Sequence, residues 1–431
     1  MNVELIHSFL GEDIIECELM QAENAQVMPA TTRLNTSVRE YSAQATLRRI
    51  QPYLPEFGVR HIVDLTFPGV DACPVFQVTR DDMRSEFFNA GKGFTRAESL
   101  VSGLMEAIEV HCYERSHPAL LVDEDWLACQ SSSGKAIPVA ALGQVDTAGR
   151  YVIGTEHVSG EVSALPAAYV FQQVEDVESG LASPNGIASG NSVNEALCHA
   201  LAEMLERHAL AGFFQQGSSG NHLRYQALER VTPPPECAHI HTCLLQLASR
   251  DISAEFVMIS SAANVAVFVC FLDVPTGGSQ RGAVHGYGAH GDSRIAMARA
   301  LGEAVQIMAL CPVTMDAEIV VDNSDTRVVM TSKQAAAIDP VFIHRQRLAD
   351  HALLTQLRDQ VELIDYEYMA IHDQKMVSDQ PPSTAQSLQE LIQGLQQLGI
   401  PRIYSCVISP PHLPMIVVKC FCPGLDCISG L

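Results

Sequence analysis

Three segments of the 431-residue chain combine apolar residues at helical spacing with polar side chains three or four residues apart. The segments cover about residues 96–114, 193–212 and 294–310. Their polar sets are Glu106 with Glu109, Glu203 with Glu206, and Arg299 with Glu303 and Gln306. Side chains at these spacings share one face of a helix, so each set projects together.

Carboxylates that converge without cations repel one another, by about 4 kcal/mol for a pair ~4 Å apart at an effective dielectric near 20. A divalent cation removes this cost, and hard oxygen ligands suit magnesium, which usually completes its shell with water and substrate phosphates. One interpretation is therefore a site for magnesium and a nucleotide. The other is three ordinary amphipathic helices whose glutamates pair with arginines.

Two familiar arrangements are excluded by the residues present. A di-iron bundle needs Glu-x-x-His on two helices, but the corresponding positions hold Cys112 and Ala209. No GxxxxGK[ST] motif occurs, because GKGFT at 91–95 is too short, so a P-loop is excluded.

Composition narrows the class of protein further. The formal net charge is −23, which disfavours nucleic acid and anionic membranes as partners. The N-terminus lacks the pattern of a signal peptide and no apolar run approaches a membrane span, so we expect a cytoplasmic protein. Thirteen cysteines scattered through a long chain predict reduced, mostly buried thiols rather than disulfides.

The elements expected around the carboxylate helices indicate an α/β (α+β) fold with mixed sheets. Residues 1–35 read as weakly organised, and a helix is predicted from Ser42 to Leu54. Glycine-rich turns are expected before the second and third carboxylate helices, and residues 372–384 are predicted to be a surface loop. A final amphipathic helix is expected over 387–399. Predicted strands lie at 61–67, 74–80, within 150–173, and at 252–260, 264–273, 402–408 and 415–421.

Five stretches, in order, resemble the YcaO family over most of the chain. Three carry the carboxylate helices: GKGFTRAESLVSGLMEAIEVHCYER, SPNGIASGNSVNEALCHALAEMLERHAL and GYGAHGDSRIAMARALGEAVQ. The stretch upstream is TTRLNTSVREYSAQATLRRIQPYLPEFGVRHIVDLT, and the one at the end is GLQQLGIPRIYSCVISPPHLPMIVVKCFCPGLDC. The resemblance implies a YcaO-type fold with ATP and Mg²⁺ as cofactors. It also implies a lead-in, residues 1–60, that contributes to the nucleotide site of a domain over 61–431.

Transferred position by position, the resemblance assigns four roles. Glu106, Glu109, Glu203 and Glu206 would bind magnesium. Asn191 and Glu195 would lie at the adenosine end. Arg207, Arg299 and Glu303 would contact phosphate or its metal shell and act in catalysis. Arg39 and Thr46 would touch the nucleotide.

Several assignments stay open. Arg33 is an alternative to Arg39, and Ala188 stands where the family sometimes has Ser. Lys92 either aids phosphate binding or belongs to a simple turn. Cys112, next to His111, is predicted to serve packing rather than to act as a nucleophile. Cys420, Cys422 and Cys427 are predicted chiefly to pack, ahead of a role in carrying or sensing sulfur and ahead of a zinc site.

The family's chemistry sets the functional hypotheses. ATP phosphorylates the oxygen of a peptide backbone amide after a nucleophile adds to it. The first hypothesis is a thioamide made with an external sulfur donor, because the chain lacks a proline-rich tail and a fused docking domain. An azoline formed from Cys, Ser or Thr of a precursor peptide is the second, and a non-catalytic ATP-binding accessory protein is the third. A TfuA-like protein is the expected delivery partner, and a homodimer is allowed for.

Overall fold

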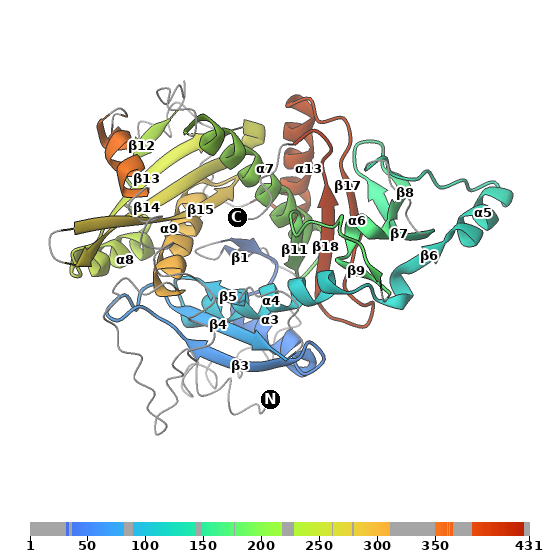
Figure 1. Ribbon diagram of the computed structural model, residues 1–431, viewed down its shortest axis with the longest axis horizontal. Helices are drawn as coiled ribbons and strands as arrows, with labels where there is room; N and C mark the ends of the chain where they lie inside the picture. The colour runs from blue at the N-terminus through green and yellow to red at the C-terminus, as the bar shows by residue number, and fades with distance from the viewer. Residues whose placement is uncertain are drawn as a thin grey trace.

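The computed structural model gives a mixed α/β architecture with three main sheets (Figure 1), which confirms the predicted fold class. It describes residues 32–33, 37–81, 89–142, 149–175, 177–217, 228–260, 262–277, 280–310, 350–359, 361, 363–364 and 382–425. Among these residues, no helix is both long enough and apolar enough to cross a membrane. The proposed division of the chain at residue 60 stays a prediction.

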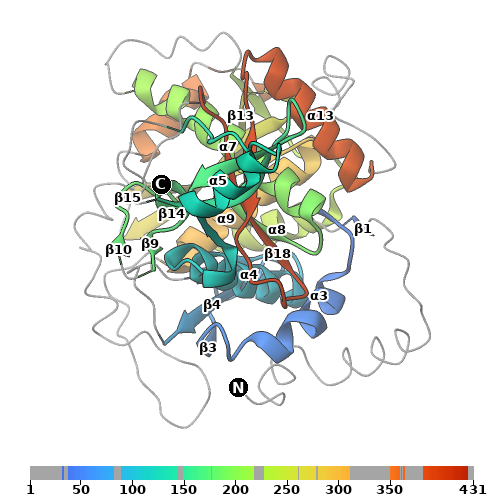
Figure 2. The same ribbon diagram turned by 90° about the vertical axis from the view of Figure 1, so that its right-hand side faces the viewer.

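The first sheet is a three-stranded antiparallel sheet that lies at the bottom of Figures 1 and 2. Its strands are β3 (Val59–Asp64), β4 (Val75–Arg80) and β5 (Asn89–Lys92). Helix α4 (Arg96–Glu114) packs on β4 and β5, and α3 (Ala43–Ile50) packs on α4. Ahead of α3, the short strands β1 (Thr32–Arg33) and β2 (Val38–Arg39) pair with each other.

Helix α4 begins and packs as its residues predict. The hydroxyl oxygen of Thr95 accepts a hydrogen bond from the backbone N–H of Glu98 at 3.2 Å, which satisfies one of the free donors of the first turn. Leu100, Leu104 and Ile108 recur at helical spacing and are all fully buried in the core. The opposite face of the helix is therefore left for polar residues.

The second sheet has six strands and occupies the right side of Figure 1. Its path runs β11 (Ile187–Gly190), β18 (Ile416–Phe421), β17 (Tyr404–Val407), β7 (Arg150–Glu156) and β6 (Leu121–Asp123), with β8 (Glu161–Pro166) on β7. Helix α7 (Val193–Gly217) packs on β11 and β18, and α13 (Thr384–Gln397) packs on α7. Smaller elements nearby are α5 (Glu124–Ser132), α6 (Ala167–Val170), β9 (Gln173–Val174) and β10 (Val177–Glu178).

The third sheet has five strands. They are, in order, β15 (Gln280–His290), β14 (Ala266–Gly277), β13 (Ser253–Ser260), β12 (Glu229–Val231) and β16 (Leu363–Ile364). Helix α9 (Ser293–Leu310) packs on β15 and β14 and also reaches β5 of the first sheet. Helix α8 (Ala238–Ala248) packs on β13, and residues 350–359 are also helical.

The glycine-rich segments before α7 and α9 are mostly strand, which corrects the prediction of turns: residues 187–190 form β11 and residues 286–290 belong to β15, while a turn occupies residues 185–186. A β-carbon at Gly91 of β5 would overlap the backbone of Ser99 and Gly103 on α4. One at Gly288 of β15 would overlap the backbone of Ala296 and Ala300 on α9. These glycines are present because helix and strand backbones touch, and a turn was not needed to explain them. The same correction removes the turn interpretation of the GKG motif.

Two further predictions concern residues near the C-terminus. The predicted loop 372–384 lies mostly outside the described residues, and its last residue, Thr384, is buried at the start of α13. Cys420 and Cys422 are buried in the core cluster that includes α7 and α13, as the packing prediction requires. Cys427 lies outside the described residues.

Candidate active site

A cavity of about 480 Å³ lies where α4, α7 and α9 approach one another. Each helix presents its polar face to this cavity, while its apolar face is buried in one of the cores. All twelve predicted site residues line it: Arg39, Thr46, Lys92, Glu106, Glu109, Asn191, Glu195, Glu203, Glu206, Arg207, Arg299 and Glu303. Residues up to 264 positions apart in the chain, from Arg39 to Glu303, therefore meet in one place.

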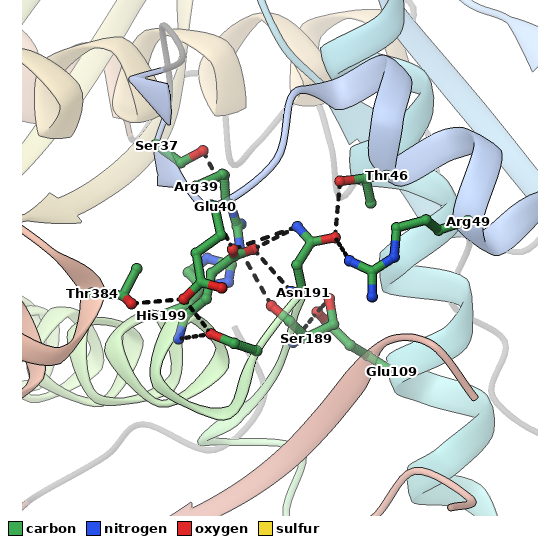
Figure 3. A network of polar contacts seen from close by, with 12 residues as sticks. Ser37, Arg39, Glu40, Thr46, Arg49, Glu109, Ser189, Asn191, His199 and Thr384 are labelled. Carbon is green, nitrogen blue, oxygen red and sulfur yellow. Dashed lines mark hydrogen bonds and ion pairs between the residues drawn. The ribbon is translucent and has the colours of Figure 1, made fainter. Parts of the chain in front are cut away.

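One end of the cavity is centred on Asn191, just before α7 (Figure 3). Its side-chain oxygen accepts hydrogen bonds from Thr46 Oγ1 and from Arg49 Nη1, both at 3.1 Å. Its amide nitrogen donates to Glu195 Oε1 at 3.1 Å. Arg49 was not predicted, although it lies three residues after Thr46 and therefore on the same face of α3.

Arg39 anchors the N-terminal segment to the same end. Its Nη1 donates to Glu195 Oε1 at 3.0 Å and to the carbonyl oxygen of Ser189 at 3.3 Å. The backbone N–H of Glu40 donates to the other oxygen of Glu195 at 2.9 Å. Arg39 is thus placed at the cavity, whereas Arg33 lies in β1, paired with Val38.

The other end of the cavity gathers carboxylates from three helices. Burial, followed by the charge of Glu109, raises the pKa of Glu106 to about 8. Burial raises the pKa of Glu109 to about 7, although Ser189 donates two hydrogen bonds to it. Burial, followed by the charge of Glu303, raises the pKa of Glu206 to about 7. The cations and hydrogen-bond donors among the described residues therefore do not offset the free-energy cost of ionising all these carboxylates.

Three cations border this end. Arg207 Nε donates to Glu203 Oε1 at 2.9 Å, four residues earlier on α7, and burial still raises the pKa of Glu203. Lys92 forms an ion pair with Glu303, so it faces the cavity from β5. Arg299 Nη2 donates to His199 Nε2 at 2.8 Å.

The donors present fit magnesium. They are carboxylate oxygens, which Mg²⁺ prefers, and they would be stabilised in their charged forms by a divalent cation. Among the described residues, no three His, Cys, Asp or Glu side chains surround one point closely enough to hold a metal unaided. Magnesium in proteins commonly has one or two carboxylate ligands and completes its coordination shell with water and phosphate oxygens, which is consistent with this arrangement.

The remaining predictions concern residues beside the site. Cys112 is buried in the hydrophobic core and does not line the cavity, so the packing prediction is correct. His111 stacks edge-on against Phe57 with ring centroids 5.2 Å apart. Ala188 is fully buried in β11, and the neighbouring Ser189 supplies the hydroxyl to Glu109 instead. Neither Ser189 nor His199 was predicted, because neither stands in a helical carboxylate pattern.

Comparison with known proteins gives the family. A family model described as YcaO cyclodehydratase, ATP- and Mg²⁺-binding, matches residues 90–426. An uncharacterised protein of Methanothermobacter thermautotrophicus is 27% identical over 274 residues, which are 61% of this chain and 69% of that protein. An uncharacterised protein from the region 3′ of tfuA in Rhizobium leguminosarum bv. trifolii is 27% identical over 206 residues. That match spans 42% of this chain and 46% of the relative, about half its length.

A solved structure has a similar fold. The structure of YcaO from Methanopyrus kandleri bound with AMPPCP and Mg²⁺ superposes with a TM-score of 0.65 at 18% identity. The superposition covers 94% of this chain and 99% of that protein. The chain belongs to the YcaO family. It is accordingly an ATP-dependent enzyme of the class that modifies peptide backbones, with ATP and Mg²⁺ as its cofactors.

Proposed function

We propose that this enzyme uses Mg-ATP to phosphorylate the oxygen of a peptide backbone amide and that an external sulfur donor supplies the nucleophile, giving a backbone thioamide. The observation that carries the first half is the convergence of carboxylates from α4, α7 and α9 on one end of a cavity, where three cations border them. Phosphoryl transfer needs positioning and charge neutralisation more than covalent help from the protein, and this cavity offers both.

The two ends of the cavity would divide the nucleotide between them. Arg39, Thr46, Asn191 and Glu195 would hold the adenosine end, so the lead-in segment 1–60 would belong to the site. Bound Mg-ATP would supply the phosphoryl group that turns the amide oxygen into a leaving group.

The carboxylates and cations would occupy the phosphate end. Glu106, Glu109, Glu203 and Glu206 would hold the metal. Lys92, Arg207 and Arg299 would neutralise the phosphates, with Glu303 orienting Lys92.

The nature of the nucleophile rests on a different observation. One relative lies beside tfuA, which favours a TfuA-like partner and sulfur delivery to a precursor peptide or protein. The matching family model is described as a cyclodehydratase, which favours the alternative product, an azoline made from a Cys, Ser or Thr side chain. Both products need the same step, phosphorylation of the amide oxygen once a nucleophile has added, and differ only in which nucleophile adds.

Mass spectrometry separates the two products. The assay combines the protein, a TfuA-like partner, a precursor peptide, ATP and sulfide. Relative to the unmodified peptide, exchange of oxygen for sulfur adds about 16 Da, whereas cyclodehydration removes about 18 Da; each route passes through a phosphorylated intermediate. A loss of mass in the absence of any sulfur source would refute the thioamide and support the azoline. Nucleotide binding with no peptide-dependent phosphate release would favour the third hypothesis, a non-catalytic accessory protein.

A further inference from the structure

A second cavity, of about 710 Å³, adjoins the first. Its walls come from β2, the N-terminal half of α7, the end of β15, α9, the turn 262–264 and α13. Its volume is in the range typical of ligand sites. The residues common to both cavities are Ser37, Arg39, Glu195, His199 and Arg299. The two cavities therefore adjoin along a wall of polar side chains.

Two residues of this shared wall have donor groups that no described residue uses. Arg299 can only donate, so His199 Nε2 accepts its hydrogen bond and a neutral imidazole must carry its proton on Nδ1. Neither His199 Nδ1 nor Arg299 Nε has a hydrogen-bond partner among the described residues. Unsatisfied polar atoms at a cavity wall call for an explanation, and a ligand that accepts hydrogen bonds is one.

The opposite wall is a strained turn held by a helix. Ala263 and Asn264 have φ values of 55° and 60°, a left-handed conformation that costs a non-glycine residue about 1–2 kcal/mol. A β-carbon at Gly394 of α13 would lie 2.5 Å from the carbonyl oxygen of Ala263, so the helix packs directly on the turn. Strain of this kind persists where surrounding structure enforces it, and it concentrates at ligand sites.

Charges of the second cavity are largely paired within the protein. Arg39 pairs with Glu195 at 3.0 Å, and Asp292 pairs with Arg294 at 2.8 Å. This wall therefore suits a neutral ligand that makes hydrogen bonds better than a second phosphate group. Arg299 faces both cavities, so a carbonyl oxygen bound there would lie beside the phosphate end of the first.

We propose that the second cavity binds the backbone of the acceptor peptide and presents its amide to the nucleotide where the two cavities meet, beside His199 and Arg299. The inference rests on the proposed function and adds where the substrate lies. Helix α13 forms the outer wall, with Gln386, Ser387 and Glu390 facing the cavity. None of these three residues lines the nucleotide cavity.

The test fills the second cavity from α13. Ser387→Trp and, as a second variant at an exposed position, Glu390→Trp place a large ring in it. Gln389→Trp is the matched control, because Gln389 is on the same helix but faces the hollow formed with His157 and Val158. The probes are Mg-AMPPCP for calorimetry and, for steady-state kinetics, the precursor peptide that the wild-type enzyme modifies in the mass-spectrometric assay.

We expect both filling variants to raise the KM for the peptide at least about tenfold, equivalent to about 1.4 kcal/mol, with the affinity for Mg-AMPPCP within about twofold of wild type. The Gln389→Trp variant should match wild type in both measurements. Loss of nucleotide affinity in the filling variants would assign the cavity to the nucleotide and overturn the proposal. Unchanged peptide KM in both would also overturn it, while the proposed function would stand. A wild-type protein that never modifies the peptide would overturn the proposed function and this site with it.

Discussion

The two ends of the first cavity contain the same residue types, buried carboxylates with nearby cations, but differ in how well the carboxylate charges are balanced. At the end that we propose for adenosine, Glu195 is almost fully buried, and its two oxygens accept hydrogen bonds from Arg39, Asn191 and the backbone of Glu40. At the end that we propose for the phosphates, Glu106 and Glu206 are close to other carboxylates, and their pKa values are raised. The hydrogen bonds of the first end are complete without a ligand, whereas the carboxylates of the second end are stabilised when they bind protons or cations.

The adenosine end is therefore organised by hydrogen bonds, whereas the phosphate end is distinguished by unbalanced charge. Because the adenosine end is hydrogen-bonded in advance, it costs little to organise when a nucleotide binds. Because the phosphate end is electrostatically unbalanced, its carboxylates are available to a metal ion. Each prediction below would break or sharpen this distinction, beginning with the largest expected effect.

Removing one carboxylate from the phosphate end should nearly abolish nucleotide binding. We expect Glu206→Ala to weaken the affinity for Mg-AMPPCP at least about 100-fold, or about 2.8 kcal/mol, and Glu203→Ala to do the same. Calorimetry with and without Mg²⁺ measures the change, and wild type should bind only with the metal. The exposed Glu161→Ala serves as control. Wild-type affinity in both cavity variants would remove the basis of the metal assignment.

Disturbing the adenosine end should have a smaller effect, confined to nucleotide affinity. Arg49 donates to Asn191 and to the carbonyl oxygen of Pro414, so Arg49→Met should reorient the Asn191 amide. We expect a loss of about tenfold, or about 1.4 kcal/mol, by calorimetry. Arg48→Met, its neighbour on α3, is the control, because Arg48 makes no contact with the site within the part of the chain that the structure describes. Equal affinities in the two variants would contradict a preformed adenosine end.

The phosphate end should also make stability depend on pH. The folded pKa values of Glu106, Glu109 and Glu206, about 7 to 8, lie above the ordinary value of 4.5. The folded state thus binds protons more tightly, so its stability from these groups is complete below pH 4.5 and is lost as pH rises to about 8. Urea unfolding without Mg²⁺ across this range measures the loss.

The matched variant for the pH experiment is Glu106→Gln combined with Glu206→Gln. In it the fall of unfolding free energy between pH 4.5 and 8 should be smaller than in wild type. Binding of Mg-AMPPCP to wild type should strengthen over the same range, because the metal needs ionised ligands. A fall of equal size in the variant would assign the pH dependence to other groups.

The smallest effect concerns Glu106 alone. At pH 8 without Mg²⁺, Glu106→Gln should stabilise the protein by about 1 kcal/mol, because it removes a raised-pKa carboxyl beside Glu109. Urea titration measures this gain, and the same variant should lose Mg-dependent nucleotide affinity. A destabilised variant would mean that the carboxylate serves the fold rather than the metal.

The sequence predicted the phosphate end better than its surroundings. Helical spacing placed Glu106 and Glu109 on one face of α4, and that regularity depends only on local geometry. The contacts of Arg49 and Ser189 were not predictable in the same way, since they join residues 142 and 80 positions from their partners. Long-range pairing leaves no periodic trace in the chain.

The strands before the helices were misjudged for a related reason. Glycine at positions 91 and 288 reads as a turn residue when only local conformation is considered. In the structure, glycine is needed at these positions because another backbone passes too close to leave room for a side chain. Only the packed partner, a helix that begins a few residues further along the chain, distinguishes the two uses.

The direct contact between these strands and helices also bears on how such a protein can change over time. The height of α4 above β5, and of α9 above β15, is fixed by backbone atoms meeting backbone atoms. Substitutions elsewhere in the core alter side-chain volumes without resetting that height. A lineage could therefore exchange much of its interior and still hold its carboxylates at the same reach.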